Sequence, residues 1–72
     1  RMVTIVVEEG ESAKEIAEDL EKNGLIRDAN LFRVQEMLSA YKDKMKQGVY
    51  ELNTSMTTEE MMAIMSSEVE AE

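Results

Sequence analysis

The stretch VVEEGESAKEIAEDLEKNGLI, residues 6–26, specifies the first half of the fold. Gly10 can adopt a positive φ and turn the chain away from a preceding strand. Ser12 and Glu15 have the spacing of a capping box, which marks the start of a helix. Gly24 marks its end, because a left-handed residue commonly follows the last turn. Between these signals, four apolar residues recur at helical spacing: Ala13, Ile16, Ala17 and Leu20.

Two segments have the composition of β-strands. Residues 2–7, MVTIVV, are rich in β-branched residues. Residues 48–52, GVYEL, form a shorter run that begins at Gly48. Val6 breaks the alternation of the first segment, so we expect that strand to be covered in part on both faces. Because two helices separate the strands, a tight hairpin is excluded, and we expect a two-stranded antiparallel sheet.

A second helix is predicted from Asp28, which is a suitable N-cap. Phe32 is the only phenylalanine and is expected to anchor the core. The polar segment 42–47 ends the helix. A wide apolar face is expected from six residues: Leu31, Phe32, Val34, Met37, Leu38 and Tyr41.

A third helix is predicted after Thr57, which forms a second capping-box pattern with Glu60. Met61, Met62 and Met65 lie along one side of it. Methionines at this spacing either fill a core or form an exposed contact for a second copy or another protein. Both interpretations stay open on the sequence.

These elements predict an α+β domain, in which a βααβ unit is followed by a third, C-terminal helix. We expect a single domain over residues 1–72, with a core over residues 2–53. The C-terminal helix is expected over residues 57–67 and an acidic tail over residues 68–72.

The composition restricts the possible chemistry. The chain has 72 residues without Cys or His, so we expect no metal, no cofactor and no nucleophile–histidine site. Its carboxylates fall in polar segments, where we expect them to be exposed and without catalytic use. The formal net charge of −8 argues against nucleic acid or an anionic membrane surface as a partner. No apolar run is long enough to span a bilayer.

The ordered landmarks resemble the YceG-like family, the MltG-type endolytic murein transglycosylases. The similarity covers residues 3–66, in the part of that family with a LysM-like fold. Glu8 departs from the family's usual proline, and Gln47 from the alanine of its A-G-x-Y motif. The matching positions are Gly10, Ser12, Ile16, Ala17, Leu20, Gly24, Ile26, Phe32, Gly48, Tyr50, Met56, Glu59 and Glu60.

The resemblance implies a non-catalytic module at the cell envelope, outside the cytoplasm, that binds the glycan strands of peptidoglycan. The family's catalytic domain is not matched, so no catalytic residue is carried over. The chain begins at Arg1, so we expect a fragment or processed product, whose membrane contact would be an anchor outside these residues. In LysM-like modules the sugar lies between the two loops, which implies a site at Gly10, Glu11, Ser12, Gln47, Gly48 and Val49.

The alternative function is protein interaction. In that case Met61, Met62 and Met65 would contact a second copy or an envelope protein, and the edge of the sheet would offer a further contact.

Overall fold

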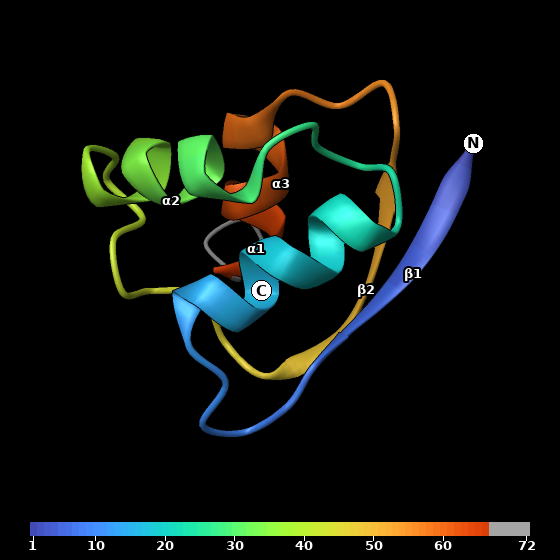
Figure 1. Cartoon of the computed structure of the whole chain (residues 1–72). Coiled ribbons are helices and arrows are strands. Elements are labelled where there is room, and N and C mark those ends of the chain that lie inside the picture. Colours follow the sequence, from blue (N-terminus) through green and yellow to red (C-terminus); the bar gives the residue numbers. More distant parts are fainter. Residues whose placement is uncertain (67–72) are drawn as a thin grey trace.

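The computed structural model describes residues 1–66 of the chain, which form an α+β fold (Figure 1). The predicted order of strand, two helices, strand and third helix is confirmed. In chain order the elements are β1 (Met2–Val7), α1 (Ala13–Lys22), α2 (Ala29–Met37), β2 (Gly48–Asn53) and α3 (Thr58–Met65).

The two strands pair antiparallel over their whole length, as predicted. Ile5 lies opposite Tyr50 on the face that the helices cover. On the opposite face Val6 lies opposite Val49, and these side chains are 51% and 68% exposed. The expectation that β1 is covered in part on both faces is therefore wrong. Val6 belongs to the open side of the sheet, and no described element packs over it.

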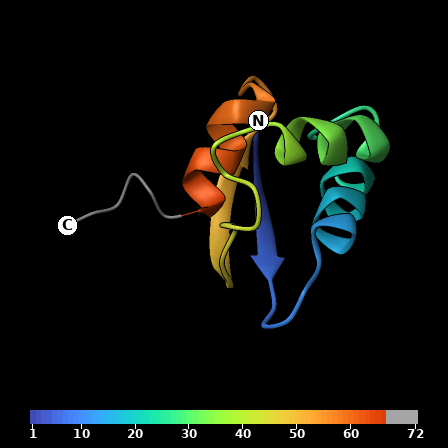
Figure 2. The ribbon, with the colours of Figure 1, turned by 90° about the vertical axis from the view of Figure 1, so that its left-hand side faces the viewer.

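All three helices lie on the same side of the sheet (Figure 1). Helix α1 contacts β1, α3 contacts β2, and α2 contacts both α1 and α3. Turned by 90°, the ribbon shows α3 beside β2 and the pair α1–α2 on the side of β1 (Figure 2). The core lies between the sheet and this arrangement of helices.

The signals around α1 are confirmed. Gly10 and Gly24 have φ values of 82° and 77°. The Ser12 hydroxyl accepts a hydrogen bond from the Glu15 N–H, and the Glu15 carboxylate accepts one from the Ser12 N–H. Asp28 caps α2 by accepting from two backbone N–H groups. Local sequence therefore determines both ends of α1 and the start of α2.

Helix α2 does not bury the predicted apolar face. Phe32 is buried as expected, but the next residue on the same side of the helix is Glu36, which is only 3% exposed. The expectation that every carboxylate is exposed is therefore wrong. The helix also ends at Met37, before Tyr41. Four of the expected core residues are exposed instead: Leu31, Val34, Met37 and Leu38.

Helix α3 belongs to the same core as the βααβ unit. Met61, Met62 and Met65 are 1%, 2% and 0% exposed and pack with the buried residues of both strands and α1. The core thus extends beyond the expected limit at residue 53. These three side chains offer almost no surface to a partner, which corrects the interpretation of them as partner contacts. The predicted acidic tail, residues 68–72, lies outside the described residues.

Candidate functional site

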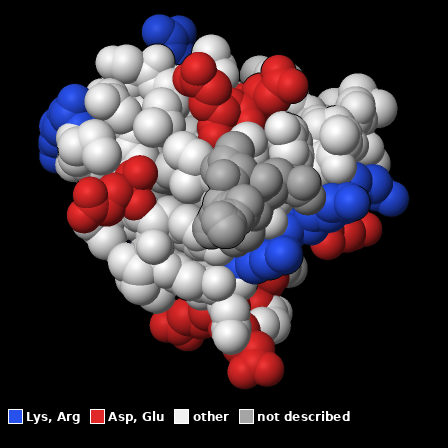
Figure 3. Space-filling model, turned by 180° about the vertical axis from the view of Figure 1, so that it is seen from behind, with Lys and Arg blue, Asp and Glu red and all other residues white. Residues whose placement is uncertain are grey.

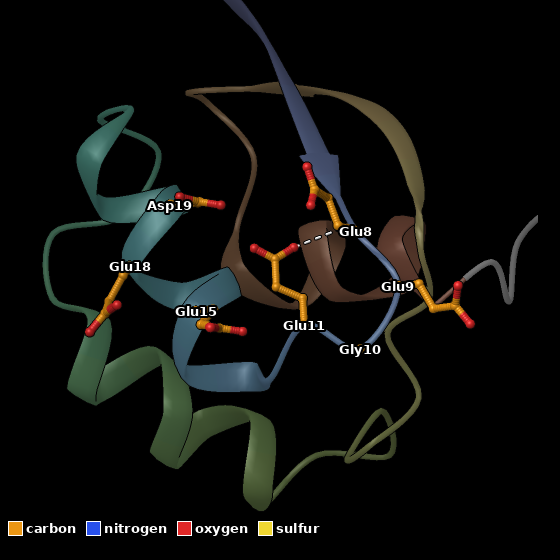
Figure 4. A pocket seen from close by; sticks show the side chains of 7 residues that line it. All are labelled: Glu8, Glu9, Gly10, Glu11, Glu15, Glu18 and Asp19. Carbon is orange, nitrogen blue, oxygen red and sulfur yellow. Dashed lines mark hydrogen bonds between the residues drawn. The ribbon is translucent and has the colours of Figure 1, made fainter.

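The turn between β1 and α1 separates two hollows in the surface. The first, which we call the acidic hollow, has a volume of about 460 Å³. Figure 4 shows Glu15 and Asp19 pointing from α1 toward Glu8 and Glu11, whereas Glu9 points away from them. The lining residues are Glu8, Glu9, Gly10, Glu11, Glu15, Glu18 and Asp19.

Clustered carboxylates do not by themselves make a metal site. Among residues 1–66, no group of three or more His, Cys, Asp or Glu side chains is arranged to hold a metal ion. The acidic hollow is therefore a region of like charge, and it gives us no reason to assign a ligand to it.

The second hollow lies between the β1–α1 loop and the segment that connects α2 to β2. We call it the interloop hollow, and its volume is about 290 Å³. This is near the lower limit of about 300 Å³ for small-molecule sites, so it suits one small group of a larger ligand. The lining residues are Glu11, Ser12, Ala13, Ile16, Glu36, Asp43 and Met45.

The first wall of the interloop hollow is held by its own hydrogen bonds. The Glu8 N–H donates to the Glu11 carboxylate at 2.8 Å, which closes the turn at Gly10. The capping box then fixes Ser12 at the start of α1, where its Oγ accepts from the Glu15 N–H at 3.2 Å. This wall is consequently determined by residues that are close in sequence.

The second wall is held by contacts to more distant elements. The buried Glu36 carboxylate accepts a hydrogen bond of 2.7 Å from the N–H of Asp43. The Lys46 N–H donates to the carbonyl of Met65, at the end of α3, at 2.9 Å. Asp43 has a φ of 59°, which is unusual for a residue with a side chain. The α2–β2 segment is therefore tied to both neighbouring helices.

The structure brings together only part of the site predicted from sequence. Glu11 and Ser12 line the interloop hollow, whereas Gly10 lines the acidic hollow. The second half of the prediction does not line the interloop hollow. Gln47 is exposed and directly precedes Gly48 in the chain. Gly48 lies under the ring of Tyr50. Val49 points to the open side of the sheet.

Besides Ala13 and Ile16 of α1, three residues that line the same hollow as Ser12 are absent from the site predicted from sequence, namely Glu36, Asp43 and Met45. A signal existed for the first of them. Glu36 follows Phe32 by one helical turn, so a buried Phe32 places Glu36 on the same side of α2. No local signal specifies the path of the chain after α2, so Asp43 and Met45 were not predictable in the same way.

The lining of the interloop hollow combines acceptors with an apolar part. Carboxylates and a hydroxyl can receive hydrogen bonds from O–H and N–H groups of a ligand. Ala13, Ile16 and Met45 provide apolar contact of the size of a methyl group. The arrangement suits a neutral, hydroxyl-rich ligand better than an anion, because its charged side chains are carboxylates.

A second surface feature is the exposed side of α2. Leu38 is 82% exposed, and Val34 and Leu31 lie one and two turns before it. Near Leu38, a hollow of about 390 Å³ separates α2 from the start of α3. Apolar side chains gathered on one side of a helix commonly mark a contact surface. We call Leu31, Val34, Met37 and Leu38 the α2 stripe.

Charge is unevenly distributed over the molecule. The face seen from behind carries most of its Lys and Arg atoms in a band on one side, with acidic groups around it (Figure 3). In the sequence, five of the eight basic residues lie between residues 27 and 46. They are Arg27, Arg33, Lys42, Lys44 and Lys46. None of the helices described within residues 1–66 has the length and apolar character that crossing a membrane requires.

Comparison with known proteins gives a family match and two curated relatives. The YceG-like family matches residues 5–72. Endolytic murein transglycosylases of Streptococcus pneumoniae serotype 2 strain D39 and of strain R6 are each 36% identical over 62 residues. The match covers 86% of this chain but only 11% of each relative. No solved structure matches.

Proposed function

The chain belongs to the YceG-like family, and from this premise we propose that it is a non-catalytic, LysM-like module of the cell envelope that binds glycan strands of peptidoglycan. The observation that carries the proposal is the interloop hollow. It lies between the two loops that the family resemblance singles out, and it is lined by acceptors around a small apolar patch. A relative whose name states action on murein makes a glycan the natural candidate ligand.

The chemistry of a glycan strand fits this lining. Its sugars carry hydroxyl groups and acetylated amines, which offer O–H and N–H donors together with a methyl group. Glu11, Ser12 and Asp43 supply acceptors at the edges of the hollow, and Met45 supplies apolar contact. The volume of about 290 Å³ suits one substituent, so neighbouring sugars would lie across the surface.

The proposed role is binding without catalysis. The chain spans 11% of the length of the curated relatives, and no residue is assigned to glycan cleavage. A module that holds murein belongs outside the cytoplasm, so we infer a location at the cell envelope. Membrane contact would then come from an anchor outside the described residues. The net charge of −8 supports the exclusion of nucleic acid as a partner.

Titration with chitin oligosaccharides, followed by amide chemical shifts, tests the proposal. We expect the largest shifts at Glu11, Ser12, Asp43 and Met45, with saturation at millimolar ligand. Unchanged shifts at these amides would contradict glycan binding at this site. Muropeptides provide a second ligand, and we expect them to bind less tightly because their carboxylates approach the carboxylates of the hollow.

A matched pair of variants localises the binding. Ala13→Leu adds three carbon atoms at a position that lines the interloop hollow, so it should weaken chitin binding. Lys14→Leu changes the next residue along α1, which is exposed and does not line the hollow. Equal affinities of the two variants would argue against this hollow as the site.

A second function, self-association, is favoured by the α2 stripe. The methionines of α3 are buried, so they cannot form this contact. The α2 stripe is exposed and is the surface we assign to self-association instead. The area of four side chains is far below the ~800 Å² per partner of a standard interface, so we expect only weak pairing. Sedimentation at several concentrations tests it. A dimer that disappears on Leu38→Glu supports this function, whereas a monomer throughout contradicts it.

A further inference from the structure

We propose that Glu36 is a positioning residue, which shapes the second wall of the interloop hollow by holding the backbone at Asp43. The inference rests on the proposed function for the identity of the ligand. Its structural part rests on burial, on one hydrogen bond and on one unusual backbone angle.

The first observation is where α2 places its side chains. Glu36 is 3% exposed, and on the other side of the helix Leu38 is 82% exposed. Burying a carboxylate is unfavourable unless it is hydrogen-bonded. The helix thus buries a glutamate and exposes a leucine. This arrangement has a physical reason only if the buried carboxylate makes an interaction that a leucine side chain cannot make.

The second observation is that interaction. Glu36 Oε2 accepts a hydrogen bond of 2.7 Å from the Asp43 N–H, seven residues further along the chain. At 2.7 Å it lies at the short end of the range for N–H···O hydrogen bonds. The bond joins the end of α2 to the middle of the segment that leads to β2.

The third observation is the backbone at Asp43. Its φ of 59° lies in the left-handed region, which residues with a Cβ adopt only when their surroundings hold them there. The flanking residues Lys42 and Lys44 are exposed, and the ion pair between Lys42 and Asp43 is a surface contact of 3.9 Å. The turn is closed by its own backbone hydrogen bond of 3.0 Å from the Lys44 N–H to the Tyr41 carbonyl, and Glu36 is the buried side chain that ties this turn to α2.

These observations meet at the interloop hollow, because Glu36 and Asp43 both line it. The facing wall at Ser12 is held by its own capping box. Loss of the Glu36 hydrogen bond should therefore move only one wall. It should enlarge the hollow and weaken ligand binding, with the rest of the fold kept.

Three variants separate this role from a general effect on folding. Glu36→Gln keeps an acceptor oxygen and should bind chitin oligosaccharides nearly as well as the unchanged chain. Glu36→Leu removes the acceptor and should weaken binding by about tenfold or more. Glu21→Leu makes the same exchange at an exposed position of α1 and should leave binding unchanged.

The exchange rate of the Asp43 amide proton is the direct readout. We expect a protected proton in the unchanged chain and in Glu36→Gln, and exchange faster by about tenfold or more in Glu36→Leu. If Glu36→Leu does not fold, Glu36→Met removes the same acceptor with an unbranched side chain of similar length and leaves the Asp43 amide proton in place for measurement.

The outcomes distinguish the two proposals. If chitin binds to none of the folded proteins, the proposed function fails, and Asp43 exchange alone decides the role of Glu36. If the Asp43 proton exchanges equally fast in the unchanged chain and in Glu36→Leu, the positioning role is overturned. It is also overturned if Glu36→Leu, or Glu36→Met in its place, binds chitin as tightly as the unchanged chain.

Discussion

The hydroxyl group of Tyr50 lies against the backbone of Gly48, so that a Cβ added to this glycine would be 3.0 Å from the hydroxyl oxygen. The same hydroxyl donates to the carbonyl of Lys46 at 2.7 Å. The ring of Tyr50 therefore folds back over the start of β2 and closes the end of the α2–β2 segment. Gly48 provides the space for this contact and adopts a φ of 153°.

Gly48→Ala is expected to lower the free energy of unfolding by about 1–3 kcal/mol, because alanine at this φ is strained and its Cβ displaces the Tyr50 hydroxyl. Gly24→Ala is the control, since Gly24 also has a positive φ, but a Cβ added there would meet nothing within 4 Å. Urea unfolding of both variants measures the difference. A smaller loss at Gly48 than at Gly24 would contradict the steric argument.

Thr57→Ala is expected to destabilise the chain by about 1 kcal/mol, since it removes the side chain that caps α3. The Thr57 hydroxyl accepts from the Glu60 N–H at 3.2 Å. Thr57→Ser is the matched variant, because serine can form the same capping box. Thermal unfolding of both variants checks this expectation. Equal losses in the serine and alanine variants would show that the cap is not the cause.

The part of the fold that sequence predicts best is the part specified by neighbouring residues. Gly10, Ser12, Glu15 and Gly24 each act within one turn of chain, so their roles follow from spacing alone. The pairing of the strands followed from their order. Ser12 was predicted as part of the site from the family resemblance, whereas its place at the start of α1 follows from the capping-box spacing.

The orientation of α2 could not be predicted in this way. Its sequence has apolar residues on two sides, with Phe32 on one and Leu31 and Val34 on the other. Only packing against α1 and α3 decides which side is buried. The wall at Asp43 depends in turn on Glu36, and therefore on that orientation, so half of the site lay beyond local reasoning.

The burial of the methionines in α3 gives a third prediction. Met65→Ala should lower the free energy of unfolding by about 2–5 kcal/mol, because it leaves a cavity in the core. Leu38→Ala shortens a side chain of similar size in the α2 stripe. It should change the free energy of unfolding by no more than about 0.5 kcal/mol. Urea unfolding at low protein concentration compares them. A small loss for Met65→Ala would mean that α3 packs loosely on the sheet.

The like charges of the acidic hollow give a fourth prediction. Glu15 and Asp19 lie one turn apart on α1, and both point toward Glu8 and Glu11 (Figure 4). Asp19→Asn should therefore stabilise the chain by about 0.2–0.5 kcal/mol at low ionic strength, because it removes one like-charge pair on the helix. The gain should decrease as salt is added, since salt screens exposed charges. Glu51→Gln is the control, because it removes one carboxylate from the open side of the sheet, outside this hollow. A gain for Asp19→Asn that persists in high salt, or an equal gain for Glu51→Gln, would contradict local repulsion as the cause.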